Sequence, residues 1–322
     1  MHAAVEAPAS PAPVRRSLAE PIGFALLGLA IVLAPTFVYP LLVMQVLCFA
    51  LFACAFNLLI GYVGLLSFGH ALFFGYGSYI SAYTAKAWGL DPGLAILAGA
   101  AAGAVLGVVV GALAIRRQGI YFAMITLALA QMMYFFAIQA PFTGGEDGIQ
   151  AVPRGKMFGM LDLSNQTVMY VVVAAIFVAG FLFIYRVVHS PFGEVLKAIR
   201  ENEPRAISLG YRTERYKLVA FVLSAMLAGL AGATKAIVFQ SATLTDVHWT
   251  MSGEVVLMTL LGGLGTVFGP AVGAAVIIAM QYYLSGFGQW VMVIQGTVFV
   301  FCVLLFRRGI VGELGNLLRT RL

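Results

Sequence analysis

Long apolar segments follow one another along almost the whole chain, and they constrain its fold more than any other feature. Hydrophobic residues make up 61% of the 322 residues and charged residues only 10%. Soluble proteins contain about 45 to 50% apolar and about 25% charged residues. A soluble fold of this length would lack the polar side chains to cover its surface, whereas an apolar exterior is stable in lipid. The sequence therefore predicts an all-α integral membrane protein.

The apolar segments have the length that a bilayer requires. A hydrocarbon core about 30 Å thick is crossed by about 20 helical residues. We expect about ten transmembrane helices, at 22–39, 41–60, 70–87, 93–115, 119–140, 168–187, 217–239, 249–264, 270–285 and 288–306. Ten crossings place both termini on one side. The short, glycine-containing segments at 249–264 and 270–285 have an alternative as a re-entrant pair, which leaves the termini on that same side.

The basic residues flank the apolar segments and predict their orientation. With a cytoplasmic N-terminus, only Lys86, Arg154, Lys156 and Lys235 of the 19 Lys and Arg residues fall outside, as the positive-inside rule requires. The domains predicted are a disordered cytoplasmic leader at 1–20, a transmembrane domain at 21–306 and a basic cytoplasmic tail at 307–322. The net charge of +6 is not gathered on one face with aromatic residues, so we expect no nucleic-acid partner.

Small residues and cysteines are expected to pack rather than to react. Cys48, Cys54 and Cys302 lie in apolar runs without metal-ligand spacing, so no metal site is predicted. Two stripes of small residues, four positions apart, predict close helix packing in lipid. The stripes are Gly99, Gly103, Gly107 and Gly111, and Ala225, Gly229 and Ala233.

Two apolar stretches are interrupted alike, at 64–71 and 262–271, and both contain the pattern Phe-Gly-x-Ala. Corresponding breaks in two halves of a chain indicate the central path of a transporter. A broken helix frees backbone N–H groups, which suit an anionic group such as a carboxylate. Tight turns at the cytoplasmic surface are the alternative, and the two interpretations are compatible.

His70 lies at the first break, and it is open to two interpretations. It is either a proton-relay residue or a residue that caps and packs the start of a helix. No Asp or Glu lies deep in a predicted span to partner it, and the nearest candidate is Glu254. The absence argues against a proton- or sodium-coupled carrier.

The longest charged segment, at 189–216, contains residues typical of the start and end of two short helices. Ser190 is predicted to cap the first and Glu203 the second, which Gly210 ends. One side of the first helix is apolar and carries Phe192, Val195, Leu196 and Ile199. From the residues alone, lipid headgroups and a protein partner are equally plausible contacts for this side.

Five blocks in order along the chain resemble the LivM type of branched-chain amino acid ABC transporter permease. They are Gly-Leu-Leu-Ser-Phe-Gly-His-Ala-Leu-Phe-Phe-Gly at 64–75, Gly-Ile-Tyr-Phe-Ala-Met-Ile-Thr-Leu-Ala at 119–128, Thr-Gly-Gly-Glu-Asp-Gly at 143–148, the segment 190–210, and Leu-Leu-Gly-Gly-Leu-Gly-Thr-Val-Phe-Gly-Pro at 260–270. The resemblance implies a type II ABC importer permease-like bundle with cytoplasmic coupling helices, in the bacterial inner membrane with both termini cytoplasmic.

The resemblance also implies partners and an alternating-access mechanism. The partners are a second, LivH-like permease, two cytoplasmic ATPase subunits and a periplasmic substrate-binding protein. The sequence has no G-x-x-x-x-G-K-[ST] phosphate loop, so ATP and Mg are expected to be used by the partner subunits. The chain itself is then expected to bind no cofactor and to be a transport subunit rather than an enzyme.

The resemblance assigns candidate site residues to three groups. The ATPase-coupling residues are Glu194, Arg200, Glu203, Ala206 and Gly210. The translocation-path residues are Ser67, Gly69, His70, Tyr121, Thr126, Gly263, Gly265 and Gly269. The outer-gate residues are Thr143, Gly144, Gly145 and Asp147.

Branched-chain or other apolar amino acids are the first substrate class that the resemblance implies. Leu129-Ala130-Gln131 stands where many relatives place an acid, which keeps the related permeases for urea, short-chain amides and aromatic acids as alternatives. A stand-alone secondary carrier is the remote alternative.

Overall fold

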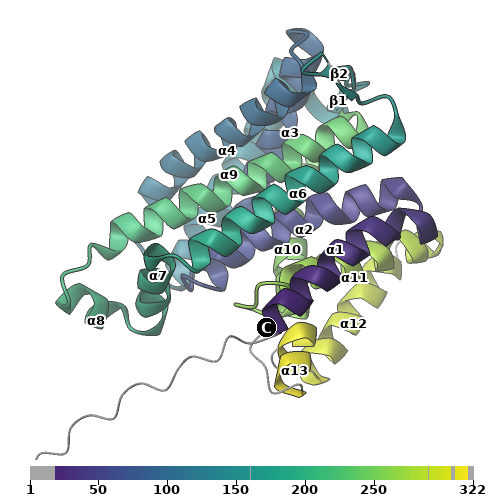
Figure 1. Cartoon of the computed structure of the whole chain (residues 1–322). Coiled ribbons are helices and arrows are strands. Elements are labelled where there is room, and N and C mark those ends of the chain that lie inside the picture. Colours follow the sequence, from purple (N-terminus) through teal and green to yellow (C-terminus); the bar gives the residue numbers. More distant parts are fainter. Residues whose placement is uncertain (1–18, 160, 289, 306–308, 318–322) are drawn as a thin grey trace, which may run out of the picture.

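The computed structural model of the chain describes residues 19–159, 161–288, 290–305 and 309–317, and most of these residues are helical (Figure 1). The longer helices are α1 (Ala19–Phe37), α2 (Pro40–Ile60), α3 (His70–Ala87), α4 (Pro92–Ala114), α5 (Ile120–Gln139), α6 (Gln166–Val188), α7 (Pro191–Glu201), α9 (Thr213–Phe239), α10 (Trp249–Gly262), α11 (Gly269–Leu284) and α12 (Trp290–Leu305). The short ones are η1 (Pro141–Thr143), η2 (Gly145–Asp147), α8 (Glu203–Ser208), η3 (Leu244–Asp246), η4 (Ser285–Phe287) and α13 (Gly309–Leu317).

Each of the ten predicted apolar segments coincides with a helix. Six helical segments are long and apolar enough to cross a membrane, namely Pro40–Ile60, Pro92–Ala114, Ile120–Gln139, Gln166–Val188, Thr213–Phe239 and Gly269–Phe287. Pro21–Phe37 and Val293–Cys302 are apolar but shorter. The leader lies outside the described residues except for its last two, which begin α1, and the tail is described only where it forms α13.

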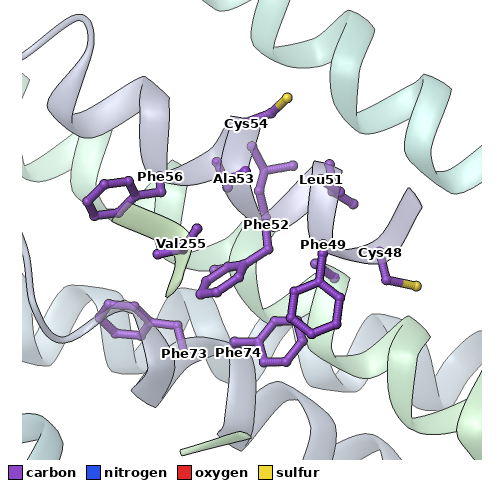
Figure 2. Close-up of a cluster of buried hydrophobic side chains, with 14 of the residues drawn as sticks. Cys48, Phe49, Leu51, Phe52, Ala53, Cys54, Phe56, Phe73, Phe74 and Val255 are labelled. Atoms are coloured by element: carbon purple, nitrogen blue, oxygen red, sulfur yellow. The ribbon is translucent and has the colours of Figure 1, made fainter. Parts of the chain in front are cut away.

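The centre of the bundle consists of α2, α3 and α9, whose residues are mostly buried. Figure 2 shows rings of α2 beside Phe73 and Phe74 of α3, and the ring centroids of Phe52 and Phe74 lie 4.6 Å apart. Cys48 and Cys54 are free and buried in this core, which confirms their predicted role in packing. Since α2 is enclosed by other helices, it forms the axis around which the bundle packs.

The two small-residue stripes face each other, and the close helix packing predicted from them is confirmed. A Cβ atom added at Gly103 of α4 would lie 2.6 Å from the carbonyl oxygen of Ala225 in α9, and one at Gly99 would lie 2.6 Å from Cβ of Ala233. Real Cβ atoms do not approach so closely, so larger side chains would push the helices apart. The stripes therefore bring the backbones of α4 and α9 into direct contact.

The bundle has two distinct ends (Figure 1). One end carries α7 and α8, and we call it the α7 end. The other, the strand end, carries β1 (Ile149–Gln150) paired with β4 (Ser241–Ala242), and β2 (Lys156–Met157) paired with β3 (Leu161–Asp162). Lys86 donates a 2.7 Å hydrogen bond to the Gln150 carbonyl there, and Arg154 donates a 2.6 Å bond to the Val238 carbonyl. These basic residues are among those that the sequence places on the opposite side from the Arg-rich loop.

Candidate functional site

The loop between α6 and α9 forms two short helices, and their caps agree with the sequence except at one residue. The hydroxyl of Ser190 accepts a hydrogen bond from the Gly193 amide and so caps α7, as predicted. Gly210 follows the end of α8 with φ of 89°, as a terminating glycine does. The cap of α8 is Asn202, whose side chain accepts from the Arg205 amide, so the prediction of Glu203 as the cap was wrong.

The apolar side of α7 packs against its own chain. Leu196 and Ile199 are buried, and the ring of Phe192 stacks on that of Tyr216 in α9 with centroids 5.7 Å apart. The sequence left lipid headgroups and a protein partner as alternative contacts for this side of α7. In the structure the bundle itself largely covers it. A groove of about 940 Å³ remains beside it, lined by Phe192, Val195, Leu209, Tyr211 and Tyr216 among others.

The candidate coupling residues divide between the surface and the interior. The carboxylate of Glu203 forms a 2.5 Å ion pair with Lys217 of α9 and accepts a 2.9 Å hydrogen bond from Gln118. Glu203 therefore ties α8 to the loop between α4 and α5. Ala206 is buried, whereas the side chain of Glu194 is 68% exposed and pairs with Lys197 at 2.8 Å.

Arg200, the remaining coupling candidate, is an exposed residue whose guanidinium reaches back to the backbone of the bundle. Its guanidinium donates a hydrogen bond to the carbonyl of Gly61, directly after α2. Of the five predicted coupling residues, Glu194, Arg200 and Gly210 are exposed at the α7 end. Their proposed contact with an ATPase stays a prediction.

The second helix break, residues 263–268, is held by the side chain of one residue in α2. Asn57 donates a 2.9 Å hydrogen bond to the Thr266 carbonyl and accepts a 3.0 Å bond from the Gly265 amide. Within the break, the Thr266 hydroxyl donates to the Gly263 carbonyl at 2.8 Å and accepts from the Gly269 amide at 3.1 Å. We did not single out Asn57 from the sequence, although an amide within the apolar run 41–60 is a usable signal.

The first break, residues 61–69, is held by hydroxyl groups from three places. The Gly69 amide donates to Ser67, the Phe68 amide to Thr126 of α5, and the Ala71 amide to Ser252 of α10, at 3.2, 3.2 and 2.9 Å. We expected these amides to be free for an anionic group. In this structure serine and threonine oxygens occupy them, and Ser252 was missed by the sequence analysis.

His70 connects three helices at the first break. Its Nε2 atom lies 2.8 Å from the Ser224 hydroxyl, which lies 2.5 Å from the Ala55 carbonyl. A carbonyl only accepts, so the hydroxyl proton goes to Ala55 and Nε2 of His70 must be the donor to Ser224. The ring is fully buried against Phe56 and Phe73. This arrangement favours the packing interpretation over a proton relay.

The remaining candidates are Tyr121 and the outer-gate residues. Tyr121 is exposed in the first turn of α5, while Thr126 is buried. Thr143, assigned to the outer gate, is buried at the strand end and donates to the carbonyls of Ala137 and Ala140 at 2.6 Å each. Gly144 and Gly145 have positive φ values of 79° and 62°, and Asp147 is exposed. The structure places these gate residues about one compact turn.

A buried ion pair at the strand end was missed by the sequence analysis. Lys235 of α9 and Asp246 of η3 lie 2.7 Å apart, and their side chains are only 13% and 2% exposed. Asp246 also accepts a 3.2 Å hydrogen bond from the Thr243 amide. The pair draws residues 240–248 into the bundle, where Val247 lies against Gly75 of α3. Lys235 was assigned to the outside from charge patterning alone, and the sequence analysis did not consider Asp246.

Glu254 of α10 hydrogen-bonds the side chain of Gln281 in α11. Among the described residues, no group of three or more His, Cys, Asp and Glu side chains is placed to hold a metal ion.

The candidate site as a whole consists of two hydrogen-bonded helix breaks and a charged helical loop at the same end of the bundle.

Sequence comparisons show which known proteins the chain is similar to. The LivM permease proteins of the high-affinity branched-chain amino acid transport systems of Salmonella typhimurium and Escherichia coli are each 28% identical over 282 residues. That match covers 79% of this chain but 65% of theirs, which is less than two thirds of their length. The ribose import permease protein RbsC of Bacillus subtilis is 28% identical over 190 residues, which is 56% of this chain and 58% of that protein.

No solved structure matches the chain. The family model described as the branched-chain amino acid transport system / permease component matches residues 40–303. This match covers most of the chain, and the chain therefore belongs to the family of branched-chain amino acid transport permease components, as the resemblance predicted.

Proposed function

We propose that the chain is the membrane-spanning permease subunit of an ATP-driven importer for branched-chain or other apolar amino acids. Its partners are a LivH-like permease, two ATPase subunits and a periplasmic binding protein, and it works by alternating access. One observation carries the proposal, namely that a capped helical pair at the α7 end reaches both helix breaks through the side chain of Arg200. A motor that displaces this pair would act directly on the breaks.

The surface of the α7 end supports a protein partner. Leu209 is 69% exposed and Ile207 is 55% exposed, next to the groove that Tyr211 lines. Apolar side chains at the tip of a charged loop suit insertion into a pocket of a partner. We expect Leu209→Glu to prevent assembly with the ATPase subunits while the permease itself still folds, because the side chain touches little of its own chain. Co-purification of the ATPase with this variant at the wild-type ratio would argue against docking here.

The orientation that we propose puts the α7 end and both termini in the cytoplasm. All ten predicted segments then cross the bilayer, with α10, about 21 Å long at 14 residues, completed by the irregular residues 240–248. The test is labelling of Ile207→Cys and Asp147→Cys with a membrane-impermeant maleimide, in a chain whose own cysteines are replaced. In intact cells we expect labelling at position 147 and not at 207. The reverse pattern would overturn the orientation and the ATPase contact together.

The transport activity itself is tested in vesicles that contain the whole assembly. We expect uptake of leucine that requires ATP on the side of the membrane that carries the ATPase subunits. It should also require the binding protein on the opposite side. An assembly with a hydrolysis-deficient ATPase is the matched control. Uptake that persists without ATP and follows a proton or sodium gradient would favour the secondary carrier instead.

Substrate class is tested by competition in the same vesicles. Excess isoleucine or valine should suppress leucine uptake, whereas urea, a short-chain amide, an aromatic acid or ribose should not. Ribose belongs in this set because one relative of this chain is a ribose import permease. If leucine uptake is suppressed by urea, the amide, the aromatic acid or ribose and not by isoleucine or valine, that solute replaces amino acids as the proposed substrate.

A further inference from the structure

The side chain of Arg200 lies against both helix breaks at the same time. Its guanidinium donates to the Gly61 carbonyl, at the start of the first break. A Cβ atom added at Gly64 would lie 3.2 Å from Cγ of Arg200, and one at Gly265, in the second break, would lie 3.1 Å from Nη1. One side chain from α7 therefore contacts glycines that are about 200 positions apart in sequence.

These two glycines leave room for the arginine. Gly64 and Gly265 have φ values of 82° and 73°, a region that residues with a side chain rarely adopt. A larger residue at either position would strain the backbone and also crowd the Arg200 side chain. The glycines thus provide both the turn and the surface on which Arg200 rests.

Asn57 completes the connection from the other side. It holds the second break to the last turn of α2 through the Gly265 amide and the Thr266 carbonyl. Gly61, which accepts from Arg200, follows one turn later in the chain. α7 is therefore hydrogen-bonded to the residue after α2, and the end of α2 is hydrogen-bonded to the second break. The first break begins at the same point.

The rest of α7 gives Arg200 a fixed position. Ile199 and Leu196 on the same helix are buried against the bundle, so α7 is not free to rotate about its axis. Lys197 is in a different situation, since it pairs with Glu194 of its own helix. Arg200 and Lys197 thus carry the same charge on one helix, but only Arg200 is shown to bond the backbone of the breaks.

We propose that Arg200 is a positioning residue that makes residues 61–69 and 263–268 move together with α7. The inference rests on the proposed function, because the displacement of α7 would come from the ATPase subunits. A charged donor suits this task, since a hydrogen bond from an ionised group is about twice as strong as one between neutral groups. The same Nη1 atom of Arg200 bonds the Gly61 carbonyl and lies beside Gly265, so the planar guanidinium meets both breaks at one point.

The first test uses the purified permease and needs no transport. Hydrogen–deuterium exchange is measured in Arg200→Gln, with Lys197→Gln as the control that removes the same charge from the same helix. We expect faster exchange in both breaks in Arg200→Gln, and wild-type exchange in Lys197→Gln. If exchange rises in neither break, or in only one of them, Arg200 does not connect the two breaks and the inference is wrong.

The second test measures solute imported per ATP hydrolysed in the reconstituted assembly. We expect this ratio to fall about tenfold in Arg200→Gln while hydrolysis continues. Arg200→Lys keeps the charge and a donor, and should restore the ratio to within about threefold of wild type. An unchanged ratio in Arg200→Gln, or no difference between the Gln and Lys variants, overturns the inference. Absence of ATP-dependent uptake in the wild-type assembly would instead overturn the proposed function.

Discussion

The two ends of the bundle hold irregular backbone by different kinds of interaction. At the strand end, residues 240–248 are fixed by the buried ion pair of Lys235 and Asp246 and by pairing of β4 with β1. At the α7 end, the breaks are fixed by neutral hydrogen bonds to Asn57 and to the hydroxyls of Ser252 and Thr126, with Arg200 as the charged donor.

The difference has consequences for which end rearranges. Removing one partner of a buried ion pair is destabilising by about 3 to 5 kcal/mol. Leaving a buried neutral group without its partner costs about 1 to 3 kcal/mol. Each neutral hydrogen bond of the two breaks is therefore easier to exchange for another. In a permease that works by alternating access, we expect the breaks at the α7 end to move and the strand-end connector to keep its place.

The largest effect is expected from Lys235→Met, which leaves the carboxylate of Asp246 buried and unpaired. Unfolding free energy, measured by denaturant titration in mixed micelles, should fall by about 3 to 5 kcal/mol. The control is Lys86→Met, because Lys86 bonds a carbonyl at the same end from an exposed position. The double variant Lys235→Met with Asp246→Leu should recover part of the loss, since no charge is then left unpaired. If Lys235→Met lowers the unfolding free energy by less than Asn57→Leu or Ser252→Ala, the proposed difference between the two ends is wrong.

A smaller effect is expected from Asn57→Leu, a substitution of similar size within α2. The variant leaves the Gly265 amide and the Thr266 carbonyl without their partner, at about 1 to 2 kcal/mol each, so about 2 to 4 kcal/mol in total. Exchange of backbone amides should rise at 263–268 and stay unchanged at 240–248. Gln45→Leu is the control, as it makes the same chemical change in the same helix away from the break. Equal losses in the two variants would remove the special role of Asn57.

Helix positions were predictable because they depend on local composition and length. The apolar segment predicted at 41–60 forms α2 at Pro40–Ile60, and the one at 70–87 forms α3 over the same residues. Ser190 and Gly210 were recognised because capping needs only the residue and its neighbours. Asn202 was missed because Glu203 was chosen for its place directly before Pro204, although Asn is a preferred N-cap residue and Glu is not.

Contacts between distant residues had no comparable signal. Asn57 and Thr266 are 209 positions apart, and Arg200 and Gly61 are 139 apart. Charge patterning placed Arg200 at the cytoplasmic surface with its neighbours, but it does not tell which arginine of a charged loop bonds the backbone of the bundle. The similar breaks were visible in the sequence, while the side chains that hold them came from elsewhere in the fold.

The first break is tested by Ser252→Ala, which removes the acceptor for the Ala71 amide. An unpaired buried amide is expected to lower the unfolding free energy by about 2 kcal/mol. Amide exchange should rise at residues 67–72 and not at 263–268, because the second break is held separately by Asn57. A combined variant with Asn57→Leu should show additive losses, to within about 0.5 kcal/mol. A strong departure from additivity would mean that the two breaks form one cooperative unit even without Arg200.

The smallest effect is expected from Gly64→Ala, which tests the backbone of the first break rather than its hydrogen bonds. The left-handed conformation at φ of 82° is unfavourable for alanine by about 1 kcal/mol, and the added methyl lies 3.2 Å from the flexible Cγ of Arg200, which can shift. Gly253→Ala is the matched control, because Gly253 lies within α10 and an added Cβ there meets no atom within 4 Å. That control should be stabilised by about 0.5 to 1 kcal/mol, since alanine favours a helix interior. If Gly64→Ala is also stabilised in the denaturant titration, the first break tolerates an ordinary turn residue and its glycine is not required by backbone geometry.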